Sequence, residues 1–274
     1  MSVLWIDGQL LDEEKARISP FDHALLTGDG VFESLRIYKG VPFAARRHLE
    51  RLGRSAAGLR LRVPDASVLR SAMHEVIAAN DLVEGRARIT VTGGVSPLGS
   101  ERGSSGPTVI VAARPMAPWP RVTDVVVVPW PRNERGALAG LKTVSYGENV
   151  VALDFAAERG AGEALFGNLA GNLCEGTGTN VFVGIDNRLF TPPLTAGCLP
   201  GVTRDLVLEV VEVAEEDIPL DALAQVDEAF LTSSTREVQP IRAIDGRVLA
   251  GAPGPLTEAA TAAFAQLLRR DLDP

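Results

Sequence analysis

The chain has 274 residues, of which 46% are hydrophobic, and it carries a formal net charge of −8 at pH 7. This length can bury a sizeable core in one large or two ordinary domains. The acidic balance argues against a nucleic-acid partner, since binding phosphates needs a basic face. Because there is no apolar run of transmembrane length and no basic start typical of a signal peptide, we expect a cytoplasmic protein without a membrane partner.

The cysteines and histidines give no pattern typical of a metal site. The two cysteines, Cys174 and Cys198, have no metal-ligand spacing, and the three histidines, His23, His48 and His74, are scattered along the chain. We therefore expect no metal and two reduced thiols in a cytoplasmic protein.

The first part of the chain is predicted to be rich in strands, with two helices. A short strand begins at residue 3, and alternating apolar residues over 30–43 predict a hairpin that turns at Lys39 and Gly40. Apolar residues at helical spacing predict helices over 47–61 and 66–79. Two further strands are expected, one on each side of a loop rich in glycine and serine, over 86–94 and 107–115.

The second part follows a stretch with three prolines, RPMAPWPR. A strand is predicted from residue 123, and a helix from 148 to Gly160. Further strands are predicted over 163–168, 172–184, 187–193 and 227–249. Two more helices are predicted, one within 199–214 after a Pro-Gly turn and one over 257–272. Since strands and helices come in blocks without steady alternation, the fold class is α+β with two domains. We expect an N-terminal domain over 1–115, a linker over 116–121 and a larger domain over 122–274.

Lys142 is the most conspicuous basic residue, because only three of the 27 Lys and Arg residues are lysine. Lys15 and Lys39 lie in polar, turn-like sequence, whereas Lys142 lies in the mostly uncharged run GALAGLKTVSYGENVV. A lysine in dry surroundings has a lowered pKa, and its neutral amine can bond to a carbonyl cofactor. The alternative interpretation is that a genomic preference for arginine left Lys142 by chance.

Two segments have the composition of anion sites. The sequence PGVTRD places a tight turn at Gly201 before a helix, where free backbone N–H groups favour a phosphate. The sequence TSSTRE, which follows a predicted strand, offers further hydroxyl and amide groups. Each of these segments alone also fits an ordinary helix start or strand-end turn.

Two charged residues are candidates for holding a cofactor. Glu175 lies between an apolar strand and a glycine-rich turn, where a carboxylate can pair with a ring nitrogen. Arg51 lies on a predicted helix three residues after His48 and suits a bidentate phosphate contact. An acidic turn residue and a solvated arginine are the alternative interpretations.

Taken in order, these segments resemble the fold type IV family of pyridoxal-phosphate (PLP) enzymes, also called class IV aminotransferases. The resemblance runs through WIDG, GDGVFES, HLERLGRSA, LKTVSYGENV, LCEGTGTNVFV, FTPPLTAGCLPGVTRD and DEAFLTSS. It implies a two-domain fold like that of D-amino-acid aminotransferases, with a small and a larger α/β domain. It also implies PLP as the cofactor, a small-molecule amine as the substrate, and a homodimer.

The resemblance assigns a role to each candidate residue. It implies that Lys142 bonds to the cofactor and moves the proton, that Glu175 holds the pyridine nitrogen, and that Tyr146 approaches the ring hydroxyl. The residues implied to hold the phosphate are Arg51, Val202, Thr203, Ser233 and Ser234. In several relatives, glycine and threonine replace the serine pair.

The loop after VTGG distinguishes members of the family. D-amino-acid aminotransferases have an arginine and a histidine where this chain has Leu98 and Ser100. The LAGLK run and the arginine-glycine pair at 102–103 resemble aminodeoxychorismate lyases, whereas GVFES, with Glu33, looks as much like a transaminase. We therefore expect a lyase that converts 4-amino-4-deoxychorismate to p-aminobenzoate and pyruvate, with Arg88 and Arg102 binding the substrate carboxylates.

Other functions stay open at this point. An aminotransferase would use the same lysine with a 2-oxo acid acceptor and a branched-chain, D-amino-acid or (R)-amine donor. A non-catalytic PLP-binding protein is an alternative of another class. Arg88 and Arg102 are also compatible with a location on the surface beside a strand.

Overall fold

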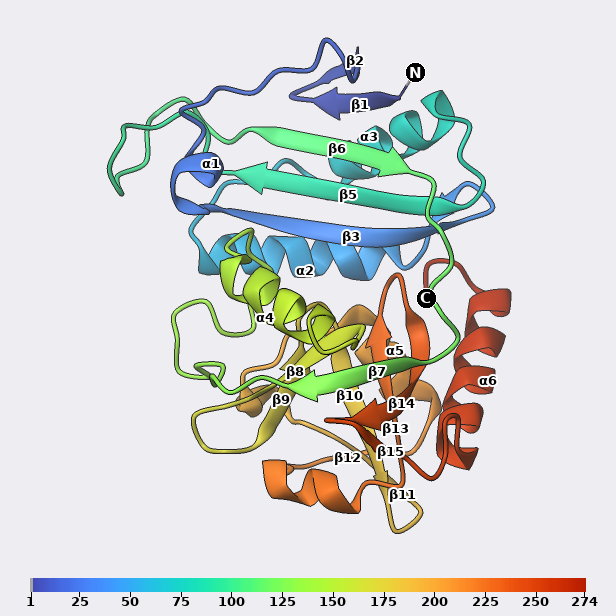
Figure 1. Ribbon diagram of the computed structural model, residues 1–274. Coiled ribbons are helices and arrows are strands. Elements are labelled where there is room, and N and C mark those ends of the chain that lie inside the picture. The colour runs from blue at the N-terminus through green and yellow to red at the C-terminus, as the bar shows by residue number, and fades with distance from the viewer. Residues whose placement is uncertain (1) are drawn as a thin grey trace. The chain divides into compact units, whose positions relative to one another are not determined.

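The computed structural model describes residues 2–274, which form two compact units (Figure 1). The first unit contains the chain up to Pro118 together with Leu141–Tyr146 and Asp271–Pro274, and the second contains Trp119–Gly140 and Gly147–Arg270. The junction after Pro118 falls between residues 116 and 121, whereas residues 141–146 and 271–274, expected in the second domain, belong to the first unit. Residues 141–146 bond to β3, and the Leu272 carbonyl accepts from the N–H of Ala44. The α+β class is confirmed.

The first unit is built on an antiparallel sheet of six strands in the order β2-β1-β6-β5-β3-β4. The strands are β1 Val3–Ile6, β2 Gln9–Asp12, β3 Gly30–Tyr38, β4 Val41–Pro42, β5 Gly85–Thr92 and β6 Val109–Arg114. The helices of this unit are α1 His23–Thr27, α2 Ala45–Gly58 and α3 Ala66–Ala79.

The hydrophobic core of this unit lies between one face of the sheet and helices α2 and α3. Because side chains alternate along a strand, Val31, Leu35 and Ile37 of β3 point into that core together. The predicted hairpin is present: Lys39 and Gly40 both have positive φ, as a two-residue turn between twisted strands requires. The glycine supplies this conformation without strain.

The second unit is built on a sheet of nine strands, ordered β12-β11-β10-β13-β14-β7-β8-β9, with β15 paired to β14. Its strands are β7 Thr123–Val127, β8 Glu163–Gly167, β9 Leu173–Gly176, β10 Asn180–Ile185, β11 Arg188–Thr191, β12 Ala214–Glu215, β13 Glu228–Ser233, β14 Glu237–Ile244 and β15 Arg247–Val248. Its helices are α4 Gly147–Ala157, α5 Val202–Val210 and α6 Pro255–Arg270, with the 3-10 turns η1 Leu194–Ala196 and η2 Leu220–Gln225.

Both faces of this larger sheet are covered in its β7–β8 region. Val125 and Leu165 belong to one apolar cluster, whereas their neighbours Val126 and Phe166 belong to another. Since neighbouring side chains on a strand point to opposite faces, the two clusters lie on opposite sides of the sheet. This explains why the strands here read as continuous apolar runs rather than alternating ones.

The main helices were predicted close to their observed positions, and α3 matches its predicted range. The exception is α5, which was expected to continue to residue 214 but ends at Val210. Its C-cap, Val211, is extended, and a valine-rich run has a weak helix preference because β-branched side chains are restricted in a helix. Within residues 2–274, no helix is both long and apolar enough to cross a membrane.

Candidate active site

Lys142 lies on a short segment that is added to the open edge of β3. The backbone N–H of Phe32 donates to the Lys142 carbonyl at 3.1 Å, and that of Val144 donates to Gly30 at 2.9 Å. The Lys142 N–H donates to the Ser55 hydroxyl of α2 at 3.0 Å. Because β4 pairs only with the far end of β3, this segment satisfies backbone groups that would otherwise be unpaired. The backbone of Lys142 is therefore held by hydrogen bonds to both β3 and α2.

The Lys142 side chain is buried against aromatic rings. Its residue exposure is 9%, and its Nζ lies 4.4 Å from the centroid of the Phe32 ring. The amine donates to the Tyr146 hydroxyl at 3.4 Å, and the Tyr146 ring meets that of Phe32 edge-on. Arg88 lies over the same Phe32 ring at 3.7 Å. One phenyl ring thus contacts both the lysine amine and a guanidinium group, as expected for cation–π contacts.

A buried carboxylate lies next to Phe32 in the chain and on the opposite face of β3. Glu33 is fully buried and accepts from Arg51 of α2 twice, at 2.8 Å from Nε and 2.7 Å from Nη2. His48 of the same helix lies 2.6 Å from Glu33 through its Nδ1. The arginine and histidine are three residues apart, so both face the strand from one side of the helix.

The charges in this cluster favour an ionised Glu33 and a neutral His48. Burial alone raises the pKa of Glu33, but Arg51 and His48 outweigh it and lower that pKa to about 2. Burial lowers the pKa of His48, with further lowering by Arg51 and Lys142, although Glu33 acts in the opposite direction. His48 is therefore the Nδ1–H tautomer, which donates to the carboxylate. The cluster fixes the guanidinium of Arg51.

In the second unit, Glu175 lies at the middle of β9 with its carboxylate held on two sides. Oε2 accepts from the backbone N–H of Leu199 at 2.8 Å, and Oε1 lies 3.6 Å from Arg132 Nε, an ion-pair distance. Arg132 itself stacks over Phe166 at 4.0 Å and bonds to Glu148 at 2.6 Å. The arrangement fixes the direction of the Glu175 carboxylate.

The start of α5 forms a narrow cradle around Asn180. Gly201 is the N-cap, and a Cβ at this position would lie only 1.9 Å from Asn180 Oδ1, so Asn180 would have to move to admit a side chain. Asn180 also donates to the Leu199 carbonyl at 2.8 Å and pairs with Thr232 across strands β10 and β13. The first-turn N–H groups at Val202 and Thr203 have no partner within the helix. These are the features of an anion site.

The end of β13 belongs to the same region of the second unit. Thr232 has a buried hydroxyl without a hydrogen-bond partner among residues 2–274. The Ser233 hydroxyl accepts from the N–H of Arg236 at 3.1 Å, and Ser234 follows directly. Asn180 and Leu199 thus connect Glu175, the start of α5 and the end of β13.

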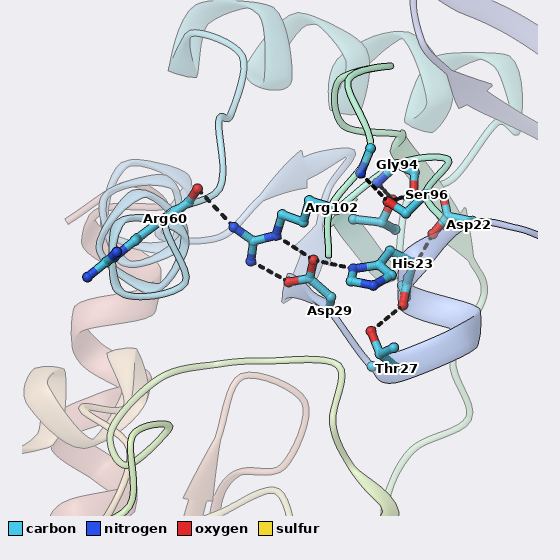
Figure 2. Close-up of polar contacts among 12 residues, drawn as sticks. Asp22, His23, Thr27, Asp29, Arg60, Gly94, Ser96 and Arg102 are labelled. Atoms are coloured by element: carbon cyan, nitrogen blue, oxygen red, sulfur yellow. Dashed lines mark hydrogen bonds and ion pairs between the residues drawn. The ribbon is translucent and has the colours of Figure 1, made fainter. Parts of the chain in front are cut away.

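Arg102 is already paired with a carboxylate of the chain. Its Nε and Nη2 donate to the two oxygens of Asp29, each at 2.6 Å, and its Nη1 donates to the Arg60 carbonyl at 3.1 Å (Figure 2). Leu98 and Ser100 lie in the same loop, and Ser100 lines an open pocket next to Arg102. The substrate-binding roles of Arg88 and Arg102 stay predictions.

Other groups singled out in the sequence do not form a metal or thiol centre. Among residues 2–274, no cluster of three or more His, Cys, Asp or Glu is arranged to hold a metal ion. Cys174 and Cys198 are buried and unbridged, and burial raises the pKa of both thiols.

Several site residues were not predicted from the sequence. A charged residue inside the apolar strand GVFES indicates a buried ion pair. In the sequence, however, Glu33 served only as a feature that resembles transaminases. Ser55, Asn180 and Arg132 have no signal of their own, because ordinary surface residues share their local sequence. Their roles follow only from contacts with residues far away in the chain.

Comparisons with known proteins place these features in context. The family model described as amino-transferase class IV matches residues 30–244. A putative branched-chain-amino-acid aminotransferase of Methanocaldococcus jannaschii is 35% identical over 90% of this chain and 89% of its own length. An aminodeoxychorismate lyase of Bacillus subtilis is 31% identical over 89% of this chain and 87% of its own length. The crystal structure of the Escherichia coli branched-chain amino acid aminotransferase has a TM-score of 0.92 and 30% identity, with 97% of this chain and 94% of that chain covered.

Replacing Glu33 with glutamine should destabilise the protein near neutral pH by about 3–5 kcal/mol, since it removes one side of a buried ion pair. The pKa of Glu33 is lower in the folded protein than its ordinary value of 4.5, so its stabilisation is present above that value. It is lost as the pH falls toward 2. Urea unfolding of the wild-type protein and the Glu33→Gln variant between pH 7 and 2.5 should therefore show a difference in the free energy of unfolding that becomes smaller as the pH falls.

The control is Glu84→Gln, because Glu84 pairs with Arg36 of the same strand at 3.5 Å but is half exposed. It should change stability by about 1 kcal/mol or less. Equal effects of the two substitutions would show that the buried cluster is not a stabilising ion pair.

Proposed function

We propose, for a chain that belongs to the amino-transferase class IV family, the transfer of an amino group from a primary amine bearing one carboxylate to a 2-oxo acid. Enzymes of this family depend on PLP, and PLP is the cofactor of this protein. The sequence favours the lyase reaction. The pairing of Arg102 with Asp29 favours amino transfer instead.

The observation that carries this proposal is the placement of Lys142 and Arg88 on the one ring of Phe32. An arginine next to the reacting amine suits a single substrate carboxylate, which it can bind through two parallel hydrogen bonds. The second cation that the lyase reaction would use, Arg102, is engaged with Asp29. Arg88 donates through Nε to the Thr90 hydroxyl at 3.1 Å, and its two terminal nitrogens suit the single carboxylate of a simple amino acid.

The residues of each unit fit PLP. In the first unit, we assign Lys142 to the covalent bond with the cofactor, Tyr146 to its ring hydroxyl, and Arg51 to its phosphate. In the second unit, Glu175 suits the ring nitrogen. The start of α5 suits a phosphate, since the N–H groups of its first turn have no partner within the helix and the buried Thr232 hydroxyl has no hydrogen-bond partner among residues 2–274. The remaining residues assigned to the phosphate are Val202, Thr203, Ser233 and Ser234.

When bound, PLP supplies a carbonyl group that bonds to amines and an electron-accepting ring. Lys142 Nζ takes up the proton from the amine-bearing carbon of the substrate as a general base. As a general acid it would deliver that proton to the former carbonyl carbon of the cofactor, so that the amino group stays with the cofactor and the substrate leaves as a 2-oxo acid. Tyr146, which accepts a hydrogen bond from that amine, orients it. Arg88 holds the substrate carboxylate and so fixes which bond faces the lysine. The homodimer and the cytoplasmic location expected from the sequence stay predictions.

A second candidate is the conversion of aminodeoxychorismate to p-aminobenzoate and pyruvate, a step in folate biosynthesis. Two observations favour it: the similarity to the Bacillus subtilis lyase, and the position of Arg102 at an open pocket of about 460 Å³. This reaction would require Arg102 to exchange Asp29 for a carboxylate of the substrate.

A paired assay on the purified, PLP-loaded protein decides between the two reactions. We expect amino transfer from branched-chain or D-amino-acid donors, which carry one carboxylate, to pyruvate. An (R)-amine donor without a carboxylate and the dicarboxylate acceptor 2-oxoglutarate are the comparison substrates, and they should react more slowly. In the second arm, aminodeoxychorismate is supplied without an acceptor, and p-aminobenzoate is measured. Formation of p-aminobenzoate that is lost in Arg102→Ala, with no amino transfer in the first arm, would assign the lyase reaction instead.

Lys142→Ala should lower turnover by at least 10²–10⁴-fold, because proton transfer loses its acid and base. The measurement is the rate with saturating PLP, together with borohydride reduction and peptide mapping of the wild-type protein. Lys39→Ala, at an exposed hairpin turn, is the matched control and should keep full turnover. Reduced cofactor on Lys15 or Lys39 would contradict the assignment.

Glu175→Gln should retain PLP but slow the chemical step. A neutral side chain cannot keep the ring nitrogen protonated, and loss of one side of a buried charge pair costs about 3–5 kcal/mol, or more than about 100-fold in rate. Single-turnover kinetics and the cofactor absorption spectrum give the two readouts. The control is Glu148→Gln, which changes the other carboxylate on Arg132 and should leave the rate within about threefold. Wild-type single-turnover rates in the Glu175 variant would remove this residue from the site.

A further inference from the structure

Asp29 immediately precedes β3 and is bound by basic side chains from two other segments (Figure 2). Arg102 of the loop between β5 and β6 donates to both of its oxygens, and His23 of α1 lies 2.8 Å from Oδ2 through its Nδ1. The Asp29 side chain has 11% exposure, whereas that of Arg102 has 35%. The carboxylate is therefore the buried member of the pair, and the guanidinium is the accessible one.

The Arg102–Asp29 contact has the geometry with which an arginine recognises a carboxylate ligand. Two parallel N–H groups, Nε and Nη2, meet the two carboxylate oxygens at 2.6 Å each, which is the bidentate arrangement. The third nitrogen, Nη1, donates to the Arg60 carbonyl at the end of α2. Because all three nitrogens are engaged inside the chain, a carboxylate ligand must compete with Asp29 for this group.

His23 adds a second basic group at the same position. Its Nδ1 faces Asp29, and its Nε2 lies 3.2 Å from the Gly99 carbonyl, so both ring nitrogens face acceptors. The hydrogen bond to Asp29 raises the pKa of His23, against burial and against the neighbouring charge of Arg102. With Asp29 ionised, the cluster of His23, Asp29 and Arg102 has a net positive charge whenever His23 is protonated.

This cluster lines an open pocket of about 460 Å³, together with Thr27 and Ser100. The pocket lies next to the lysine segment within the first unit. The Ser145 hydroxyl donates to the Gly28 carbonyl at 2.9 Å, and the N–H of Val144 donates to Gly30 at 2.9 Å. Asp29 is thus flanked by two residues that bond to the segment following Lys142.

We propose that Asp29 is a specificity-determining residue: an internal carboxylate that occupies Arg102 and so keeps a second ligand carboxylate out of this pocket. The inference rests on the proposed function, because it takes Lys142, whose following segment bonds to the residues on either side of Asp29, as the reacting group. Removal of the Asp29 charge opens Arg102 to dicarboxylates.

The test is the binding of two unreactive ligands to the PLP-loaded enzyme by isothermal titration calorimetry. Succinate has two carboxylates, and butyrate has the same chain length with one. Asp29→Asn should tighten succinate binding by roughly tenfold or more, the size of one charge-assisted hydrogen bond, and change butyrate binding by less than about threefold. The gain should disappear in the double variant Asp29→Asn with Arg102→Ala.

The matched control is Asp124→Asn, because Asp124 receives a bidentate contact from Arg242 in the second unit. It should leave the Kd of both ligands unchanged. Asp29→Ser repeats the measurement if the asparagine variant does not fold, as judged by circular dichroism. Loss of folding in both variants would show that Asp29 is required for structure rather than for ligand selection.

Three other results would overturn the proposal: no tighter succinate binding in either Asp29 variant, an equal gain in Asp124→Asn, or a gain that survives the loss of Arg102. Because these measurements involve no turnover, a failed binding comparison leaves the amino-transfer result of the paired assay standing. An Arg102-dependent lyase result in that assay would show that a second carboxylate reaches Arg102 in spite of Asp29, and it would overturn this inference together with the proposed reaction.

Discussion

The buried ion pair between Glu33 and Arg51 is the interaction on which the first unit depends. A carboxylate without any exposure inside a strand is costly unless its charge is matched, and here two hydrogen bonds from Arg51 and one from His48 match it. The pair joins β3 to α2. Those two elements also hold the backbone of Lys142, through Phe32 and Ser55. The position of the Lys142 backbone is thus set by the same strand and helix that the ion pair connects.

Much of the fold could be predicted from the sequence because its signals are local. The helix over 66–79 has apolar residues at regular spacing, and the turn at Lys39 and Gly40 has alternating apolar residues on both sides. The end of α5 was placed four residues too late, since a valine-rich stretch reads as apolar in a helix and in a strand alike. Where helix and strand both fit, contacts outside the segment decide.

The individual candidates were found in the sequence, whereas most of their partners were not. Lys142 stood out by its rarity, and the start of α5 by its Pro-Gly turn. The pairing of Arg102 with Asp29 joins residues 73 positions apart, and nothing in either local sequence announces it. The expectation that Arg102 binds a substrate was reasonable from residue type alone, and the geometry adds a competitor for that role. Whether an arginine can bind a ligand carboxylate therefore depends also on the carboxylate of the chain with which it is already paired.

The alternation of side chains along β3 gives the strand two separate tasks. Glu33 points toward α2, while its neighbour Phe32 points to the other face and carries Lys142 and Arg88 on its ring. A single-residue insertion or deletion in this strand would exchange the two faces, placing a phenyl ring against the arginine and a carboxylate under the lysine. Length variation among related chains is therefore compatible with the loops around β3 but not with the strand itself. The number of residues in β3 decides which side chain faces α2 and which one faces Lys142.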